Sequence, residues 1–174
     1  MAEARTQLEI DVDALDEIHE VSDVGIRTLM SAHRWGGTAF HEAGWNARHM
    51  DGVDHAFLYA LEHATGRHFI HGQAVGLGTY LGAVLQDNDP EMVLGWLRRG
   101  GVDIRPEAMG IDWEAAATAM RRLAWYVRHA DLEFTIADVR PVTDDIVAEI
   151  RDRITATFGV WTEEGPTSPR GGYV

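Results

Sequence analysis

Four of the nine histidines in this sequence lie in one stretch, HAFLYALEHATGRHFIHG, between residues 55 and 72. Neutral imidazole is a common ligand of Zn²⁺ and Fe²⁺, so a histidine cluster is a candidate metal site. His55 and His63 are eight residues apart and share a helix face, whereas His68 falls in a polar loop. His55 and His71 lie near the starts of two different expected helices. Spacing alone therefore favours solvated or packed histidines over a metal shared by His55 and His71.

Helices are the elements that must position these histidines, and we expect an all-α fold. Apolar residues recur at helical spacing along most of the chain, and neither a βαβ alternation nor a G-x-G-x-x-G run is present. The expected helices cover residues 12–43 with a break near 22–25, 51–65 with Gly66 as C-cap, 71–85, the run from Asp89-Pro90 to Gly100, 113–129 after Asp112, and 144–158 after Thr143. If the helices over 51–65 and 71–85 form an antiparallel hairpin, their two first turns come together only where the loop over residues 66–70 carries the chain back.

The helix expected over residues 71–85 contains Gly72, Gly76, Gly78 and Gly82. Glycine weakens a helix, because the unfolded chain has more freedom to lose there. Four glycines on one helix indicate that another backbone or a ligand approaches it closely.

Length and composition predict one helical domain over residues 1–161, with a tail over 162–174 that we expect to be disordered. The chain has 174 residues, 45% of them apolar, and six Trp residues, which indicate large buried surfaces in the core or at an interface. A net charge of −13 argues against nucleic acid and anionic membranes as partners. No apolar run approaches the roughly 18 residues of a membrane span.

Two missing residue types exclude several kinds of chemistry. The sequence has no Cys, which removes disulfides and thiolate nucleophiles, and we expect a cytoplasmic protein. All fifteen basic residues are Arg, so a P-loop lysine and a Schiff-base lysine are excluded.

The run GWNARHMDGVDHAFLYALEHATGRHFIHGQAVGLGT resembles the metal-binding segment of the dehydroquinate synthase-like superfamily. That superfamily includes iron- and zinc-dependent alcohol dehydrogenases, glycerol-1-phosphate dehydrogenases and sugar-phosphate cyclases. Its hallmark is a histidine early in one helix, here His55, then H-G-E/Q-x-V-x-x-G opening the next, here HGQAVGLG from His71. The resemblance covers about residues 25–158, including GVDIRPEAMGI. The residues most similar to the glycerol-1-phosphate dehydrogenase branch are Gly44, Asn46, Arg48, Gly52, Asp54 and His55.

The resemblance implies that His55 and His71 are two imidazole ligands of a divalent metal, zinc or iron. Such a metal polarises a substrate alcohol as a Lewis acid, and NAD(P) carries the hydride. The sequence departs from the family at Tyr59, which stands where many relatives have a second histidine, and we take Tyr59 as the candidate catalytic residue. A tyrosine can donate a hydrogen bond or relay a proton, but its ordinary pKa near 10 differs from that of histidine.

Asn46, Arg48 and Asp54 are implied on the substrate side, facing a small-molecule substrate. The alternative is a loop held by local hydrogen bonds, in which Asn46 caps a turn and Arg48 pairs with an acid.

The sequence departs from the superfamily in what precedes His55. The third metal ligand of the family is a carboxylate well upstream, and its nucleotide-binding domain precedes the helical domain. Asp11, Asp13 and Asp16 lie too close to His55 for that ligand, and we expect them to be solvated and to help start the first helix. The chain begins with Met, and we expect it to be a complete reading frame. We therefore expect a partner chain that carries the nucleotide-binding domain, binds most of the NAD(P), and supplies the carboxylate.

Three functions are compatible with these features. The first is the helical metal-binding subunit of a split metal- and NAD(P)-dependent alcohol or polyol dehydrogenase. The second is a subunit of a sugar-phosphate cyclase, although the cyclases usually keep a second histidine and a phosphate-binding lysine that this chain lacks. The third is a non-catalytic helical interaction module, which the presence of both His55 and His71 disfavours.

Overall fold

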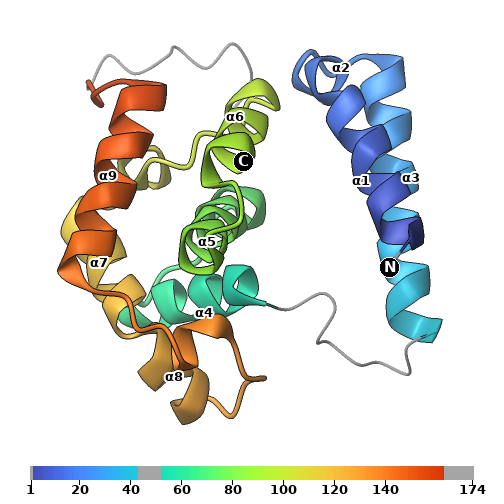
Figure 1. The fold of residues 1–174 in the computed structure, drawn as a ribbon. Helices are drawn as coiled ribbons and strands as arrows, with labels where there is room; N and C mark the ends of the chain where they lie inside the picture. The colour runs from blue at the N-terminus through green and yellow to red at the C-terminus, as the bar shows by residue number, and fades with distance from the viewer. Residues whose placement is uncertain (1, 43–51, 163–174) are drawn as a thin grey trace.

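The computed structural model describes residues 2–42 and 52–162, and every regular element within these ranges is a helix, which confirms the all-α fold. Figure 1 shows α5 near the middle, α4 crossing it, and α6 to α9 around this pair. The α-helices are α1 (Ala2–Asp13), α2 (Leu15–His19), α3 (Asp23–Glu42), α4 (Val53–Thr65), α5 (His71–Gln86), α6 (Pro90–Arg99), α7 (Trp113–Arg121), α8 (Leu123–His129) and α9 (Asp144–Phe158). The two 3₁₀ turns are η2 (Pro106–Met109) and η3 (Ile136–Asp138).

Capping residues mark the end of α4 and the starts of α6, α7 and α9, as the sequence predicts. Gly66 ends α4 in the left-handed conformation, with φ of 65°, which suits a residue without a Cβ. Asp89, Asp112 and Thr143 each accept a hydrogen bond from a backbone N–H three residues later, at 3.2, 2.8 and 3.4 Å. These bonds satisfy donors that a helix leaves open at its first turn. The helix expected over 113–129 is two helices, with Arg122 between α7 and α8.

The N-terminal region differs from the expected helix over residues 12–43. Its first helix already begins at Ala2, so Asp11 and Asp13 lie in the last turn of α1 and do not start it. The break follows α2, and α3 begins at Asp23. Pairs of polar side chains four residues apart, such as Arg5 with Glu9 at 3.0 Å, accompany α1. Apolar periodicity does not detect such a helix, which explains the wrong boundary.

The core lies between α4, α5 and the helices around them. Its largest fully buried side chains come from α4 to α9 and the segment after α6: Phe57, Leu61, Leu77, Tyr80, Leu81, Leu85, Leu94, Ile104, Met120, Leu123, Ile150 and Ile154. None of the five described tryptophans is fully buried: Trp113 packs partly buried against the core and Trp125 is 40% exposed, so burial of tryptophan at an interface stays a prediction. Trp45 lies outside the described residues, as do residues 163–174 of the expected disordered tail.

The N-terminal helices contact the rest of the chain through α6. Arg99 donates to both carboxylate oxygens of Asp16, at 2.8 and 2.7 Å, and to the carbonyl oxygen of Val12 at 3.1 Å. His19 lies against Gly101, where a Cβ would come within 2.2 Å of the imidazole Nδ1. That residues 1–161 form one domain stays a prediction. No helix in the described ranges is long and apolar enough to cross a membrane.

The crossing of α4 over α5 requires a glycine at position 78. A Cβ on Gly78 would lie 2.5 Å from the carbonyl oxygen and 2.7 Å from the Cα of Asp54, and both are backbone atoms that cannot rotate away. At Gly76 the neighbours are side chains, with Ile104 at 3.1 Å. The expected close approach of another backbone is therefore confirmed at Gly78, while Gly72 has no neighbour within 4 Å of a built Cβ.

We predict that Gly78→Ala lowers the free energy of unfolding by about 1–3 kcal/mol, because the added methyl group forces two helix backbones apart. Urea denaturation followed by circular dichroism measures this change.

Gly95→Ala is the matched control, since Gly95 lies within α6 and has no neighbour within 4 Å of a built Cβ. Alanine there should stabilise the helix by up to about 1 kcal/mol. Equal effects of the two substitutions would contradict the close crossing at Gly78.

Candidate metal centre

His55 and His71 come together at the crossing of α4 and α5. Each lies in the first turn of its helix, and their ring centroids are 5.1 Å apart with an interplanar angle of 54°. Two imidazoles that share one Zn²⁺ at about 2.1 Å in tetrahedral geometry have centroids roughly 5 Å apart. His55 is half-buried and His71 is exposed, so the pair borders solvent. This arrangement suits two ligands of a metal whose other positions face outward.

The carboxylate of Asp54 contacts both the backbone of Gly52 and the imidazole of His55. Its Oδ2 lies 3.1 Å from Nδ1 of His55, and its Oδ1 accepts the backbone N–H of Gly52 at 2.9 Å. We assign the hydrogen of His55 to Nδ1, because a carboxylate accepts and does not donate. The lone pair for a metal is then on Nε2. A carboxylate in this position fixes the tautomer and orientation of a ligating imidazole. The contact with His55 does not test whether Asp54 also binds the substrate, and that role stays a prediction.

Tyr59 lies one turn after His55 on α4. The two ring centroids are 6.4 Å apart at an interplanar angle of 52°, and Tyr59 is half-buried against the core. The phenol therefore belongs to the surroundings of the histidine pair, and its catalytic role stays a prediction. Asn46 and Arg48, the other substrate-side candidates, lie outside the described residues.

The two remaining histidines of the stretch lie away from the pair and have other neighbours. His63 packs against Tyr126 and Trp125 of α8, with ring centroids 5.2 and 6.0 Å away. His68 has a side chain that is 97% exposed and lies 3.2 Å from Oε1 of Glu62. The structure thus separates the four histidines into one close pair and two residues with different surroundings.

His55 and His71 fit two of the ligands of a divalent metal. Their rings have the required spacing, and the carboxylate of Asp54 contacts Nδ1 of His55. Within residues 2–42 and 52–162, no group of three or more histidine and carboxylate side chains is arranged to hold a metal. Neither Asp11, Asp13 nor Asp16 is therefore part of such a group. Asp16 pairs with Arg99 instead, which lowers the pKa of its carboxyl.

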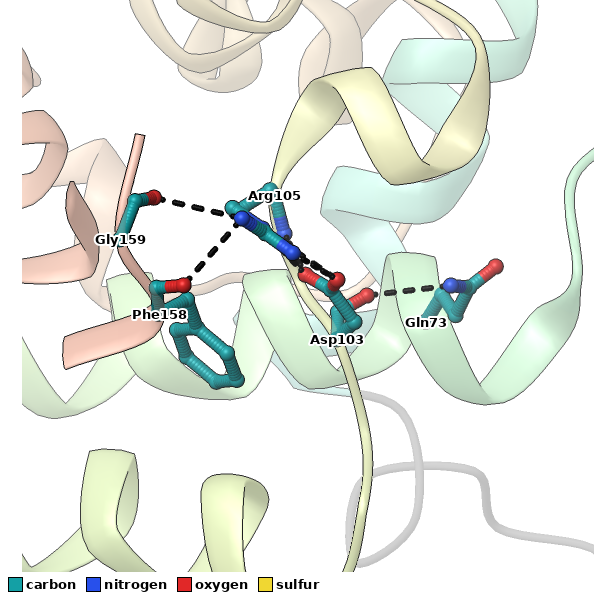
Figure 2. Close-up of polar contacts among 5 residues, drawn as sticks. All are labelled: Gln73, Asp103, Arg105, Phe158 and Gly159. Atoms are coloured by element: carbon teal, nitrogen blue, oxygen red, sulfur yellow. Dashed lines mark hydrogen bonds and ion pairs between the residues drawn. The ribbon is translucent and has the colours of Figure 1, made fainter. Parts of the chain in front are cut away.

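A polar network that joins the first turn of α5 to the segment after α6 was not predicted from the sequence. Figure 2 shows Gln73 of α5 joined to Asp103, and Asp103 joined to Arg105. Gln73 belongs to the HGQAVGLG motif, which is a signal for its importance. Asp103 and Arg105 belong to the run GVDIRPEAMGI, which also carries the resemblance, but only the fold shows that this run contacts α5.

No protein-family model matches the chain. Known proteins with similar sequences are NAD(P)+-dependent glycerol-1-phosphate dehydrogenases. That of Saccharolobus solfataricus is 30% identical over 96 residues, which are 55% of this chain and 27% of the relative. That of Thermoplasma acidophilum is 33% identical over 85 residues, or 49% of this chain and 24% of the relative. That of Methanocorpusculum labreanum is 26% identical over 114 residues, or 66% and 31%.

These matches span about a quarter to a third of the relatives' own length. Over about half of its own length, this chain is similar in sequence to the glycerol-1-phosphate dehydrogenase branch, as the motifs at His55 and His71 predict.

Proposed function

We propose that this chain is the helical metal-binding part of a metal- and NAD(P)-dependent polyol dehydrogenase, with His55 and His71 as two metal ligands. The observation that carries the proposal is the pair of imidazoles 5.1 Å apart, at the crossing of two helices whose sequence is similar to glycerol-1-phosphate dehydrogenases. The proposed metal is Zn²⁺ or Fe²⁺, since neutral imidazole suits both.

The residues of this chain have separate tasks in the proposed reaction. A bound metal polarises the substrate hydroxyl or carbonyl, while NAD(P) exchanges the hydride. His55 and His71 hold the metal, and Asp54 keeps the lone pair of His55 on Nε2. Tyr59, one turn from His55, is the candidate to hold or move a proton. Asn46 and Arg48 are the candidates to bind the substrate, and Arg48 suits a phosphate group because its planar guanidinium can donate two parallel hydrogen bonds to phosphate oxygens.

The proposal includes a second chain with a nucleotide-binding domain and a carboxylate ligand. Coordination chemistry supports it, because two imidazoles leave most of a metal's coordination sphere to other groups. Ligand sites often form between domains, where residues from both sides converge.

We predict that His71→Ala lowers the affinity of the full chain for Zn²⁺ more than about 100-fold, because it removes a ligand and not only its support. Competition with a chromophoric chelator measures the affinity. His68→Ala is the matched control, since His68 belongs to the same stretch and its side chain is almost fully exposed. Its Zn²⁺ affinity should stay within about twofold of wild type. Equal affinities for His71→Ala and His68→Ala would refute the ligand assignment.

We predict that Asp54→Asn lowers Zn²⁺ affinity about 10- to 100-fold. The amide nitrogen of Asn can donate to Nδ1 of His55, which places the imidazole hydrogen on Nε2 and removes the lone pair needed by the metal. Asp89→Asn makes the same charge change at the start of α6, where Asn also caps a helix well. If both variants bind Zn²⁺ equally well, Asp54 does not orient the ligand.

We expect the chain, combined with a nucleotide-binding protein encoded beside it, to oxidise glycerol-1-phosphate with formation of NAD(P)H, measured by absorbance. The His71→Ala complex should be inactive. A complex that binds Zn²⁺ and consumes a sugar phosphate without net NAD(P)H formation would instead favour the cyclase function. A complex that assembles but binds neither Zn²⁺ nor Fe²⁺ would favour a non-catalytic module.

A further inference from the structure

The first turn of α5, which carries His71, lacks a side-chain cap of its own. Ile70 occupies the N-cap position and offers no side-chain hydrogen bond, and the first turn contains no acidic residue. The carbonyl oxygen of Ile70 accepts the backbone N–H groups of Gln73 and Ala74, at 3.0 and 3.3 Å. A helix end without a capping side chain frays readily, because its first N–H groups have no partner within the helix. His71 needs an anchor from elsewhere if its imidazole is to keep its place beside His55.

Gln73 supplies a contact between this first turn and a distant segment. Its Nε2 donates to the backbone carbonyl oxygen of Asp103 at 3.1 Å (Figure 2). Asp103 lies between α6 and η2, so the bond joins α5 to the segment that follows α6. This bond needs the amide N–H of Gln73, because its partner is a carbonyl oxygen, which can only accept a hydrogen bond.

Asp103 is itself held by a charged side chain. Arg105 donates from Nε to Oδ1 of Asp103 at 3.0 Å and from Nη2 to Oδ2 at 2.7 Å, which is the two-pronged arrangement that guanidinium and carboxylate groups favour. The backbone N–H of Arg105 also donates to Oδ1, at 3.1 Å. Arg105 is only 9% exposed, and its hydrogen bond to Asp103 raises the pKa of the guanidinium, which therefore stays charged.

The remaining nitrogen of Arg105 binds the end of α9. Its Nη1 donates to the carbonyl oxygens of Phe158 and Gly159, at 3.2 and 3.3 Å (Figure 2). These carbonyls belong to the end of a helix, where acceptors lack partners within the helix. The guanidinium carbon also lies 5.0 Å from the ring centroid of Trp161, within cation–π range. Arg105 is thus fixed to α9, and through Asp103 it offers Gln73 an acceptor at a defined position.

We propose that Gln73, Asp103 and Arg105 form a positioning relay that fixes the first turn of α5, and with it His71, relative to His55. The part of this inference that concerns a metal rests on the proposed function. Gln73 is the residue that touches α5, whereas Asp103 and Arg105 act through it. The proposed role requires a hydrogen-bond donor at position 73, which the amide of Gln73 provides. A carboxylate of the same shape only accepts hydrogen bonds, so it cannot bind the carbonyl oxygen of Asp103.

Gln73→Met and Gln73→Glu test the relay, because both remove the donor and keep a side chain of similar length. We expect each to lower Zn²⁺ affinity about 10- to 100-fold, as for other residues that orient a ligand. The Co²⁺-loaded chain should also show a changed visible spectrum, which reports the ligand geometry and not the overall stability.

The direction of the change in Zn²⁺ affinity distinguishes a positioning role of Gln73 from an electrostatic one. A new carboxylate near the first turn of a helix is favourable to the helix and attracts a cation, so charge alone predicts tighter Zn²⁺ binding by Gln73→Glu. Gln86→Glu makes the same charge change at the exposed far end of α5 and should leave the affinity within about twofold. Tighter binding by Gln73→Glu, or unchanged binding by Gln73→Met, would overturn the positioning role.

Hydrogen exchange tests the relay without any metal. We expect the backbone amides of Ala74 and Val75 to exchange about five- to tenfold faster in Gln73→Met, as the loss of one hydrogen bond implies. The amides of Val84 and Leu85, at the other end of α5, should be unchanged. Unchanged exchange at Ala74 and Val75 would refute the anchoring. A wild-type chain that binds no Zn²⁺ even in complex with the nucleotide-binding partner would refute the proposed function, while faster exchange would still support the anchored turn.

Discussion

The backbone contact between α4 and α5 at Gly78 is the constraint on which the rest of this structure depends. Because no Cβ intervenes, the backbone of Asp54 lies directly against α5, and the next residue along α4 is His55. The same approach brings the buried side chains of the two helices into one core. The distance between the two imidazoles is therefore tied to the packing of the whole helical pair, and not to the loop that connects them.

The histidine pair lies at the N-terminal ends of two helices, and this has an electrostatic consequence. The partial positive charge at a helix N-terminus disfavours a cation, so a metal there needs anionic groups to offset it. Asp54 provides one carboxylate beside His55. A further carboxylate ligand from a partner chain would add to this, and the acidic chain as a whole, with a net charge of −13, has the appropriate sign. The electrostatics thus agree with the proposed shared site.

Most of the helix bounds after residue 52 were predictable, because local residues set them. Gly66, Asp89, Asp112 and Thr143 act on backbone groups within one turn of themselves, so their effect is visible in the sequence. The start of α1 was not predictable from apolar periodicity, since polar pairs four residues apart accompany that helix. The exposure of the described tryptophans was not predictable either, because composition does not say which side of a helix faces a neighbour.

The residue types and the local geometry of the candidate site can be read directly from the sequence: two histidines, each in the first turn of a helix, 16 residues apart along the chain. Only the tertiary structure decided that their rings lie 5.1 Å apart and that Asp54 contacts His55 through Nδ1. It also decided that Gln73 finds an acceptor at Asp103, 30 residues away. The physical reason is range: capping and helical periodicity act within a few residues, whereas the placement of two first turns depends on how whole helices pack.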